Sequence, residues 1–362
     1  MTELEKARFT INEVDKEMAV LFEKRMTAAK QVAEYKRFHG LQVTDTAREK
    51  ELIEKNSKLI ENEGLRSYYI KFLESNMDIS KKYQHRLLEG MNVAFSGVEG
   101  AFASIAANKI FPSAQAIPYP DFKSAYNSVT EGESDCVVLP IENSFNGDVG
   151  QVMDLAFFGP LYINGVYDIS VVQNLLGNKN ADITTVKSVI SHSQAIGQCN
   201  AFIKEHGFSV EEAVNTAVAA KYVAESERTD IAAIASKEAA LKYGLKIIES
   251  NINENQNNTT RFAVFSKSAK AVSVEDNHFI LMFTVTNEAG SLGKAISIIG
   301  ENGFNLKALK SRPTKELVWN YYFYAEGEGN INSENGKKML EQLKEKCSEI
   351  KLLGSFEKEI ML

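Results

Sequence analysis

The chain is poor in the residues that mark several classes of protein. Its 362 residues include three cysteines, six prolines and one tryptophan. Cys136, Cys199 and Cys347 are too widely spaced for a disulfide framework or a metal-binding pair, so we expect a reducing, cytoplasmic environment. No stretch approaches the roughly 18 apolar residues of a membrane span, and the charged start, Met1–Lys6, lacks the apolar core of a signal peptide. A net charge of −7 gives no electrostatic reason to expect a nucleic-acid partner.

The residues that are present are typical of a globular protein with several domains. Hydrophobic residues make up 44% and charged residues 25%, and 362 residues exceed one ordinary hydrophobic core. The character of the sequence changes near Glu89–Gly90 and again across the polar stretch Ser266–Asp276. We therefore expect three domains, at residues 1–90, 91–267 and 277–362.

The first segment has the pattern of an all-α domain. It contains no proline, and its apolar residues recur at intervals of three and four, as on one face of a helix. We expect helices at about 4–38, 48–60 and 65–88, with Thr44 or Asp45 capping the second. The first helix would be roughly 50 Å long at 1.5 Å per residue. So long a helix needs a partner surface, and a second copy of the chain is the best candidate.

The rest of the chain alternates between strands and helices. From Met91 to Phe265 short apolar runs bounded by glycine predict buried strands among helices, which indicates an α/β fold. The last segment predicts an α+β, ferredoxin-like unit. Its expected elements are strands at 279–285, 305–309 and 319–325, helices at 291–301 and 337–347, and a short strand near 350–353.

Charged and amide side chains occupy matching positions on the expected helices. Arg25 and Lys36 are eleven residues apart and therefore share a helix face, whereas Arg8 points elsewhere and reaches the same site only from another helix. Taken singly, each basic residue also fits a solvated helix face. Further residues with suitable spacing are Asp45, Arg48 and Glu49 on the second helix and Ser80 and Gln84 on the third.

In this order the set resembles the helical chorismate mutases, over about residues 4–88. The resemblance implies a homodimer or homotetramer that rearranges chorismate to prephenate, with the first arginine supplied by another subunit. The reaction needs no nucleophile; the protein holds a dicarboxylate in a compact form and places cations beside the ether oxygen as its bond breaks. The implied contacts are Arg8, Arg25 and Arg48 with the carboxylates, Lys36 and Gln84 with the ether oxygen, and Asp45, Glu49 and Ser80 around the ring hydroxyl.

A second set of motifs lies in the middle of the chain. Pro140–Ser144, Ser191–Gln194 with Gln198, and Asn258–Phe262 occur in this order. Together they resemble the prephenate dehydratases, over about residues 92–266. The resemblance implies two α/β lobes, like those of a periplasmic binding protein, that enclose prephenate and release phenylpyruvate. The residues that it places in or beside the active site are Asn143, Ser191, Gln198, Thr260 and Arg261.

The chemistry of that reaction calls for a hydrogen-bond donor. Loss of carbon dioxide and hydroxide restores an aromatic ring, and hydroxide is a poor leaving group that needs a donor at its oxygen. Thr260 is the candidate, while Arg261 either steadies the loop or binds a carboxylate. We expect His192 to be structural rather than a base, because the leaving group needs a proton, and Glu142 to be a helix-terminal or structural carboxylate.

Several residues depart from the dehydratase pattern. Relatives commonly carry glutamate at Val166, histidine at Gln173, proline at Ser193 and a hydroxyl residue at Ala101. These departures keep two alternatives open. One is a mutase joined to a non-catalytic amino-acid sensor, and the other is a dehydratase that prefers arogenate, a choice that the sequence does not decide.

The last segment carries two short motifs that resemble an ACT regulatory domain, Gly290–Leu292 and Lys310–Pro313. The resemblance implies feedback inhibition by phenylalanine bound at a dimer interface, with Trp319 near the site. Lys310 departs from the pattern, since an acidic residue is usual there. The implied effector contacts are Gly290, Ser291, Leu292, Ser311 and Arg312. No motif calls for a metal or a cofactor, and both proposed reactions proceed without one.

Overall fold

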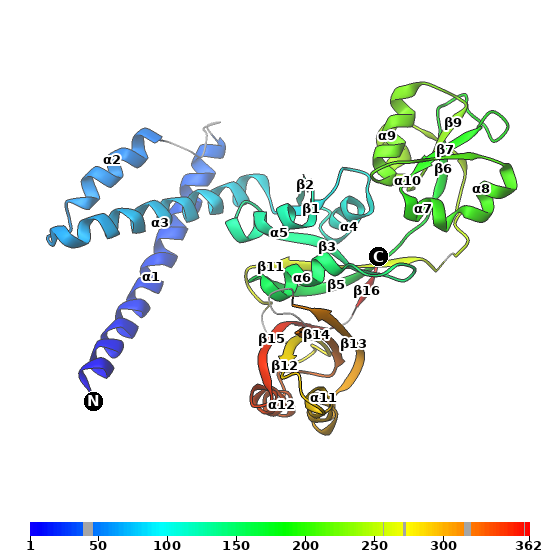
Figure 1. The fold of residues 1–362 in the computed structure, drawn as a ribbon. Helices are drawn as coiled ribbons and strands as arrows, with labels where there is room; N and C mark the ends of the chain where they lie inside the picture. Colours follow the sequence, from blue (N-terminus) through cyan, green and yellow to red (C-terminus); the bar gives the residue numbers. More distant parts are fainter. Residues whose placement is uncertain (39–45, 256, 271–272, 315–319, 358) are drawn as a thin grey trace. The chain divides into compact units, whose positions relative to one another are not determined.

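The computed structural model describes residues 1–38, 46–255, 257–270, 273–314, 320–357 and 359–362, and it divides into two compact units, Met1–Met91 and Asn92–Leu362 (Figure 1). Asp45, Thr44 and Trp319 therefore lie outside the described residues. No helix in the described part of the chain combines the length and the apolar character needed to cross a membrane.

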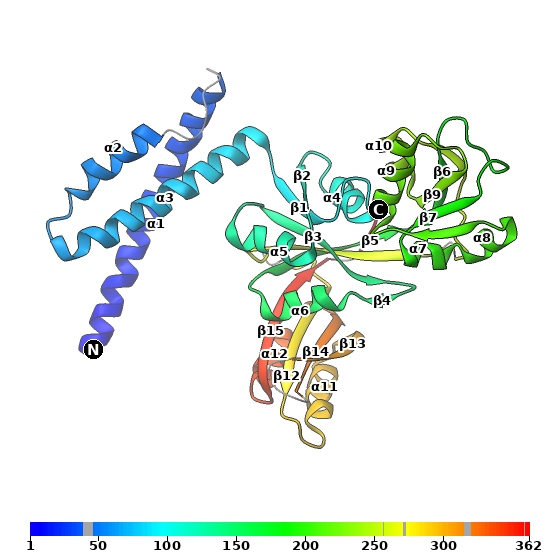
Figure 2. The ribbon, with the colours of Figure 1, turned by 45° about the horizontal axis from the view of Figure 1, so that its top comes forward.

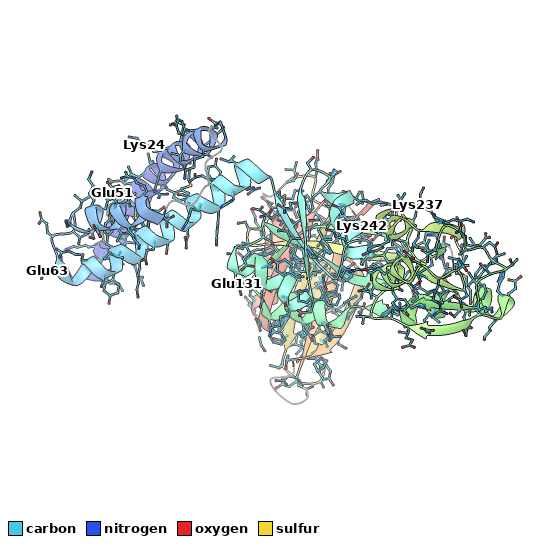
Figure 3. The ribbon with its side chains drawn as sticks, turned by 90° about the horizontal axis from the view of Figure 1, so that it is seen from above. Lys24, Glu51, Glu63, Glu131, Lys237 and Lys242 are labelled. Atoms are coloured by element: carbon cyan, nitrogen blue, oxygen red, sulfur yellow. The ribbon has the colours of Figure 1, made fainter. Side chains whose placement is uncertain are left out.

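The first unit consists of three helices. They are α1 (Glu3–Phe38), α2 (Thr46–Ser57) and α3 (Glu63–Glu89); Figure 3 labels Lys24 on α1, Glu51 on α2 and Glu63 on α3. α2 ends at Ser57, so the expectation of a helix as far as Ile60 is wrong. The chain turns there because Asn62 caps α3, its side chain accepting a hydrogen bond from the Gly64 amide.

The core of the first unit is small and lies where α1, α2 and α3 pack together. Ala29 and Ala33 of α1 and Leu73 and Met77 of α3 are buried. Much of the apolar face of α1 has no cover within the unit; the Leu21 side chain, for example, is 63% exposed. A 36-residue helix with an exposed apolar stripe is stable only against a further surface.

The second unit begins with a mixed sheet in the order β16-β5-β11-β3-β1-β2, with β4 paired to β3. We call this sheet and its helices the first lobe. Its strands are β1 (Asn92–Ser96), β2 (Gln115–Tyr119), β3 (Cys136–Asn143), β4 (Gly147–Asp148), β5 (Tyr162–Ser170), β11 (Thr259–Ser266) and β16 (Ile360–Met361). Its helices are α4 (Phe102–Ile110), α5 (Phe122–Glu131) and α6 (Gly150–Phe158).

A second lobe is built on the sheet β10-β6-β9-β7-β8. Its strands are β6 (Asn174–Gly177), β7 (Ser188–Ser191), β8 (Ser209–Glu212), β9 (Ile231–Ala235) and β10 (Lys246–Glu249). Its helices are α7 (Ser193–Gln198), α8 (Asn200–His206), α9 (Thr216–Ser226) and α10 (Lys237–Tyr243). Two connections join the lobes, residues 171–173 between β5 and β6 and residues 250–258 between β10 and β11. The α/β character expected for this part of the chain is confirmed.

The C-terminal module, residues 278–356, has the element order βαββαβ and an antiparallel sheet in the order β13-β14-β12-β15. Its elements are β12 (His278–Val285), α11 (Ser291–Glu301), β13 (Asn305–Pro313), β14 (Tyr321–Glu328), α12 (Glu334–Lys344) and β15 (Cys347–Phe356). Three expected boundaries are wrong: β13 continues past Leu309, α12 ends before Cys347, and β15 is ten residues long. Strand β13 was misjudged because Lys310 and Arg312 point inward, where carboxylates neutralise them.

The module's sheet is covered on both faces. Phe279, Leu281 and Phe283 of β12 pack on α11 and α12, which lie side by side on one face (Figure 2). The alternate residues, Ile280 and Met282, join the hydrophobic core of the first lobe. Successive side chains of a strand point to opposite faces, so β12 is apolar along its length because both faces are buried. The first lobe and the C-terminal module therefore share one core.

Candidate functional sites

The first unit contains a cavity of about 280 Å³ between its three helices. The expected pattern of helix faces brings six of the sequence-predicted residues to its wall: Arg25, Lys36, Arg48, Glu49, Ser80 and Gln84. Arg8 lies exposed on α1, away from this wall, and Asp45 falls outside the described residues.

Hydrogen bonds hold Arg25 at the centre of the wall. Its guanidinium donates to the Asn76 carbonyl oxygen at 3.0 Å and to the Ser80 hydroxyl. Burial lowers the pKa of Arg25 from its ordinary value, but an arginine remains charged at neutral pH. The Gln84 side chain is buried, and its carbonyl oxygen has no partner among the described residues. Since that amide lies on the cavity wall, it is available to a ligand.

Lys81, a fourth cation on this wall, is not among the residues predicted from the sequence. Its ammonium lies 3.1 Å from a Glu49 carboxylate oxygen and 3.0 Å from Asp78. The hydrogen bond to Asp78, followed in weight by that to Glu49, raises the pKa of Lys81 above its ordinary value despite some burial. The available signal was its position three residues before Gln84, which places both on one side of α3.

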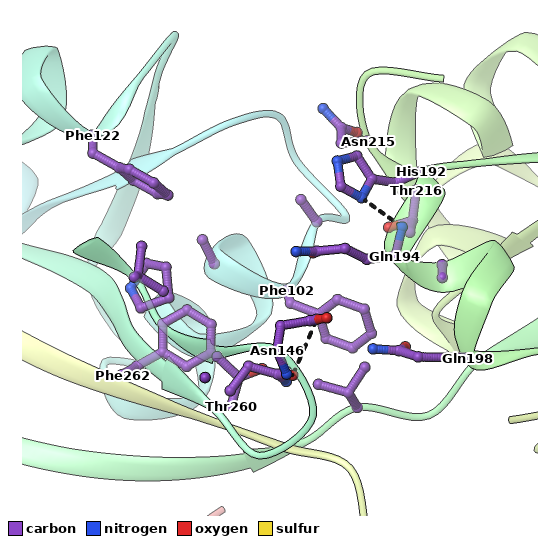
Figure 4. Close-up of a pocket in the computed structure, with 18 of the residues that line it drawn as sticks. Phe102, Phe122, Asn146, His192, Gln194, Gln198, Asn215, Thr216, Thr260 and Phe262 are labelled. Carbon is purple, nitrogen blue, oxygen red and sulfur yellow. Dashed lines mark hydrogen bonds between the residues drawn. The ribbon is translucent and has the colours of Figure 1, made fainter. Parts of the chain in front are cut away.

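The second unit contains a cavity of about 580 Å³ between its two lobes, within the usual size of a small-molecule site. In Figure 4, Thr260, Asn146 and Phe262 come from the first lobe and lie across the cavity from Gln198, Gln194 and other residues of the second. Of the sequence-predicted residues, Asn143, Gln198 and Thr260 line this cleft.

The Thr260 hydroxyl is oriented by Asn143. Antiparallel pairing of β11 with β3 sets the two residues opposite each other, and the Asn143 amide donates to the Thr260 oxygen at 2.9 Å. The Asn143 carbonyl oxygen in turn accepts hydrogen bonds from the backbone amides of Phe145 and Asn146, at 3.0 and 2.9 Å. Because its oxygen already accepts a hydrogen bond, the Thr260 hydroxyl keeps its own proton for a group in the cleft.

The cleft wall is polar without being cationic. Among the residues that the structure describes, no lysine or arginine lines it. Instead, helices α4, α6 and α9 all begin on the wall, at Ala101–Phe102, Val149–Gly150 and Asn215–Thr216. Neither Ala101 nor Val149 makes a side-chain capping bond within the described structure, so the amides at the first two positions of α4 and α6 are open to a ligand, whereas those of Val152 and Met153 bond the Val149 carbonyl oxygen. Such amides carry a partial positive charge that suits an anion.

Two sequence-predicted residues lie away from the wall. Ser191 is fully buried, and its hydroxyl donates to the Ile234 carbonyl oxygen at 2.6 Å. Arg261 points to the opposite side of β11 from Thr260, where its guanidinium pairs with several carboxylates. These are Glu142, Asp168, Glu326 and Glu359.

The carboxylates around Arg261 determine the direction of its pKa shift. Burial alone would lower its pKa, but Glu326 and Glu359 outweigh burial and raise it. Glu142 has the mirror-image balance: burial would raise its pKa, but Lys310 and Arg261 hold it below the ordinary value. Glu142 lies near the end of strand β3 and not at a helix terminus, and its structural role stays a prediction.

Most polar side chains on the cleft wall were not singled out from sequence. Asn215 and Thr216 had a usable signal, because an asparagine before an apolar helical run is a typical N-cap. Asp148 had none, because the pairing of β4 with β3 brings it to the wall, and Gln173 stood out in the sequence only as a departure from the dehydratase pattern. The polar residues of this wall that the sequence did not predict as site residues are Asn146, Asp148, Gln151, Gln173, Gln194, Asn215 and Thr216.

The two motifs of the C-terminal module lie at one end of its sheet. Thr284, near the end of β12, and Arg312, near the end of β13, both pair with Tyr322 of the strand between them. Gly290 caps α11 with φ +83°, a left-handed conformation that favours glycine. The Ser291 and Thr286 hydroxyls are 3.0 Å apart, and Leu292 packs on the module's core.

Residues 310–312 also contact the first lobe. Arg312 donates to Asp154 of α6 at 3.0 Å, and its guanidinium packs against Gly150. Lys310 pairs with Glu142 at 3.0 Å and with Asp148 at 2.5 Å. Ser311 is exposed between them. Because Asp148 and Gly150 line the cleft, this part of the module reaches the cleft wall from behind.

Within the described residues no cluster of histidine, cysteine, aspartate and glutamate is arranged to hold a metal ion.

Comparison with known proteins separates the same two regions. The chorismate mutase type II family matches residues 7–85, and the prephenate dehydratase family matches residues 93–270. The bifunctional chorismate mutase/prephenate dehydratase of Aquifex aeolicus (strain VF5) is 31% identical to the chain, covering 100% of it and 99% of that protein. The chloroplastic arogenate dehydratase/prephenate dehydratase 2 of Arabidopsis thaliana is 31% identical over 74% of the chain and 72% of its own length.

A solved structure has the fold of the second unit. It is the prephenate dehydratase of Arthrobacter aurescens in complex with L-Phe, with a TM-score of 0.68 and 24% identity, covering 74% of this chain and 90% of that one.

Proposed function

The chain belongs to the family of bifunctional chorismate mutase/prephenate dehydratases, and we propose that the cavity of the first unit is the mutase site and the cleft of the second the dehydratase site. The chain is thus an enzyme with two activities, a chorismate mutase and a prephenate dehydratase. The assignment of the two sites rests on one observation. Each cavity is lined by residues from the part of the chain that matches one family, and these include the side chains that the reaction of that family needs.

In the mutase site, Arg25 and Arg48 bind the carboxylates of chorismate, and Lys36 and Gln84 hydrogen-bond the ether oxygen. Negative charge grows on that oxygen as its bond to carbon breaks, so a fixed cation there stabilises the transition state more than the ground state. Supporting this, Arg25 is held by Asn76 and Ser80 and needs no rearrangement to receive a carboxylate. Glu49 and Ser80 organise the wall around the ring hydroxyl, a role also proposed for Asp45.

Arg8 completes the mutase site from a second copy of the chain. On its own chain it lies on the exposed half of α1, whose apolar side chains, such as Phe9 and Leu21, have no cover within the unit. A second copy that covered this stripe would bury these side chains, and pairs of copies account for a homodimer or homotetramer. We also propose a cytoplasmic location, because the few, widely spaced cysteines favour a reducing environment.

In the dehydratase site, the Thr260 hydroxyl donates to the departing ring oxygen, and Asn143 fixes that hydroxyl. Prephenate dianion plus one proton yields phenylpyruvate, carbon dioxide and water. The helix starts at Ala101 and Val149, together with wall amides such as Gln198, bind the carboxylates without a cation. Ser191 and Arg261 act from behind the wall: Ser191 supports β7 and β9, and Arg261 anchors the strand that carries Thr260.

Phenylalanine is the proposed effector of the C-terminal module, which we assign as an ACT domain. The Gly290–Leu292 turn and the Ser311–Arg312 strand end receive it at an interface between copies. The supporting geometry is that Arg312 contacts α6, and Lys310 contacts Asp148, which lines the cleft. A ligand that moved β13 would therefore change the cleft wall, and the coupling must act in both directions.

The substrate preference follows from the same site. We assign prephenate, because the mutase of the same chain supplies it. Arogenate differs in carrying an ammonium group, and Asp148 is the carboxylate on the cleft wall that suits a cation. Lys310, 2.5 Å from Asp148, is shared with Glu142 and offsets the charge of Asp148 only in part, so the assignment of prephenate rests on its supply by the mutase.

One experiment tests these assignments together. Purified protein is given chorismate, and prephenate and phenylpyruvate are followed separately, with and without phenylalanine. We expect both products in sequence and less phenylpyruvate when phenylalanine is present. Prephenate that accumulates without phenylpyruvate would instead support the degenerate sensor, and faster turnover of added arogenate would support the arogenate enzyme.

A further inference from the structure

Gln173 occupies one of the two connections between the lobes, and its backbone is fixed there. Its amide donates to the Asn253 side-chain oxygen at 3.1 Å, and its carbonyl oxygen accepts from the Ile252 amide at 2.9 Å. These bonds join residues 171–173 to residues 250–258, the other connection. The position of the Gln173 side chain is therefore set by both crossing segments.

The side chain of Gln173 lies on the cleft wall but is only 2% exposed. Its amide nitrogen donates to the Gln198 carbonyl oxygen at 3.3 Å, which ties it to a residue already assigned to the site. Its own carbonyl oxygen is buried and has no hydrogen-bond partner among the described residues. A buried acceptor without a donor destabilises a fold, so such groups are uncommon where no ligand will meet them.

The chemistry of the substrate identifies the donor that this oxygen lacks. The two carboxylates of prephenate are ionised at neutral pH and accept hydrogen bonds only, as does its ketone. The ring hydroxyl is the one group of prephenate that donates. On the basis of the proposed dehydratase site, we propose that Gln173 binds the ring hydroxyl of prephenate, its carbonyl oxygen accepting the hydroxyl proton while its amide nitrogen holds Gln198.

This contact gives Gln173 a distinct part in the reaction. With its proton directed to Gln173, the ring hydroxyl presents its lone pairs to the Thr260 hydroxyl, the donor that assists departure. The bond from the ring to the carboxylate breaks and its electron pair enters the ring, while the carbon–oxygen bond breaks and leaves its pair on oxygen. That oxygen takes up one proton from solvent and becomes water, whose original O–H still faces Gln173.

The same acceptor suits the ammonium group of arogenate, which carries the ring hydroxyl as well. Comparing the kinetics of a Gln173 variant with prephenate and with arogenate distinguishes a contact with the ring hydroxyl from a contact with the ammonium group. A contact with the ring hydroxyl affects prephenate and arogenate alike, whereas a contact with the ammonium group affects arogenate alone.

The test uses full-length protein with the substitution Gln173→Met, which keeps the length of the side chain and removes both hydrogen bonds. We expect kcat for prephenate to fall roughly tenfold, the loss of about one hydrogen bond, with KM changed less than about threefold. Mutase activity, measured on the same sample, reports that the protein is folded. Gln115→Met, on the exposed strand β2, is the matched control and should keep wild-type kinetics.

The outcomes separate this inference from the proposed function. Unchanged prephenate kinetics in Gln173→Met would overturn the inference, and so would a loss confined to arogenate. A wild-type protein that makes no phenylpyruvate from prephenate would remove the proposed function itself, because that assay involves no substitution.

A second variant, Gln173→His, gives a readout that a merely structural role would not produce. Neutral imidazole accepts a hydrogen bond, but the protonated ring does not, and an ordinary histidine titrates at about pH 6.5. We expect kcat relative to wild type to be restored above about pH 8 and to fall below about pH 6. His192 and Asp148 line the same wall in both proteins, so any effect of pH through them cancels in the ratio. A ratio that stays flat across this range would contradict the contact.

Discussion

The two cavities that we propose as the mutase and dehydratase sites have the same dianion as product and as substrate, and their walls carry different groups. On the proposed assignment, prephenate is formed in the first unit beside four cations, Arg25, Lys36, Arg48 and Lys81. It is consumed in the second unit in a cleft whose described wall carries amides, hydroxyls and helix starts but no lysine or arginine. The net charge of the ligand therefore does not decide how a site binds it.

The difference follows from where charge moves in each reaction. The mutase reaction builds negative charge on an oxygen, so a cation at that oxygen lowers the barrier. The dehydratase reaction removes charge from a carboxylate, which leaves as neutral carbon dioxide. A cation beside that carboxylate would stabilise the substrate more than the transition state and would slow the reaction. Neutral donors bind the anion without this penalty.

The largest effect that tests the contrast is expected from Thr260→Ala. Loss of the donor at the departing oxygen should reduce dehydratase kcat by about 10²–10⁴-fold, the usual contribution of a positioned proton donor. Mutase kinetics should be unchanged, because Thr260 belongs to the other unit. Phenylpyruvate formation from prephenate is the measurement.

Two variants control for the Thr260 result. Thr259→Ala removes the hydroxyl of the preceding residue, which bonds Asn257 and does not line the cleft, and it should stay active. Thr260→Ser keeps a hydroxyl and should retain most activity. A Thr260→Ala protein with dehydratase kinetics near those of wild type would remove Thr260 from the mechanism.

The reciprocal change is Lys36→Ala in the mutase site. Removing the cation at the ether oxygen should lower mutase kcat by about 10²–10³-fold, as for the loss of one group that stabilises a developing oxyanion. Dehydratase turnover of added prephenate should not change. Lys30→Ala removes an exposed lysine from the same helix and serves as the matched control. If Lys36→Ala and Lys30→Ala lowered mutase kcat equally, the loss would reflect the stability of the helix and not the charge at the cavity.

Ionic strength should change the KM values of the two sites to different extents, with a smaller effect than the substitutions above. Raising salt from about 0.01 M to about 0.5 M shortens the screening length from about 30 Å to less than 10 Å. The cationic mutase site should then show a KM for chorismate several-fold higher, while the KM for prephenate at the dehydratase changes less than about twofold. Steady-state assays across the salt series measure both. Parallel rises in the two values would show that a cationic field also attracts prephenate to the cleft.

Sequence patterns predict the parts of the molecule that depend on local spacing. The shared helix face of Arg25 and Lys36 follows from 3.6 residues per turn, and both line one cavity. Thr260 was found because its motif is continuous in sequence. The βαββαβ order of the module was readable for the same reason, although its ends were misplaced.

Partners that come from distant parts of the chain could not be foreseen. Arg261 looked equally suited to a carboxylate ligand or to a structural role, since nothing near it indicates Glu326 or Glu359. Lys310 was noted only as a departure from a regulatory motif. Its partners, Glu142 and Asp148, precede it by more than 160 residues and meet it through the packing of two sheets.

The smallest predicted effect concerns that contact between the C-terminal module and the cleft wall. Lys310→Met keeps the aliphatic part of the side chain and removes the charge, which should lower the local stability of the contact by about 1 kcal/mol, as for a partly exposed ion pair. It should also weaken inhibition by phenylalanine, because β13 would no longer hold Asp148. Hydrogen exchange of β13 amides and inhibition curves measure the two effects.

The pH dependence of this variant distinguishes an ion pair from simple packing. Hydrogen bonds and charge from Lys310 and Arg261 outweigh burial and lower the pKa of Glu142, so its contribution is present above about pH 4.5 and is lost as pH falls through the lowered value. Asp148 and Glu142 outweigh burial and raise the pKa of Lys310, so its contribution is complete below about pH 10.5 and is lost as pH rises through the raised value. The difference in exchange protection between wild type and Lys310→Met should therefore be constant between these limits and shrink beyond each. A difference that shrinks at neither limit would show that the contact depends on the shape of the lysine stem and not on its charge.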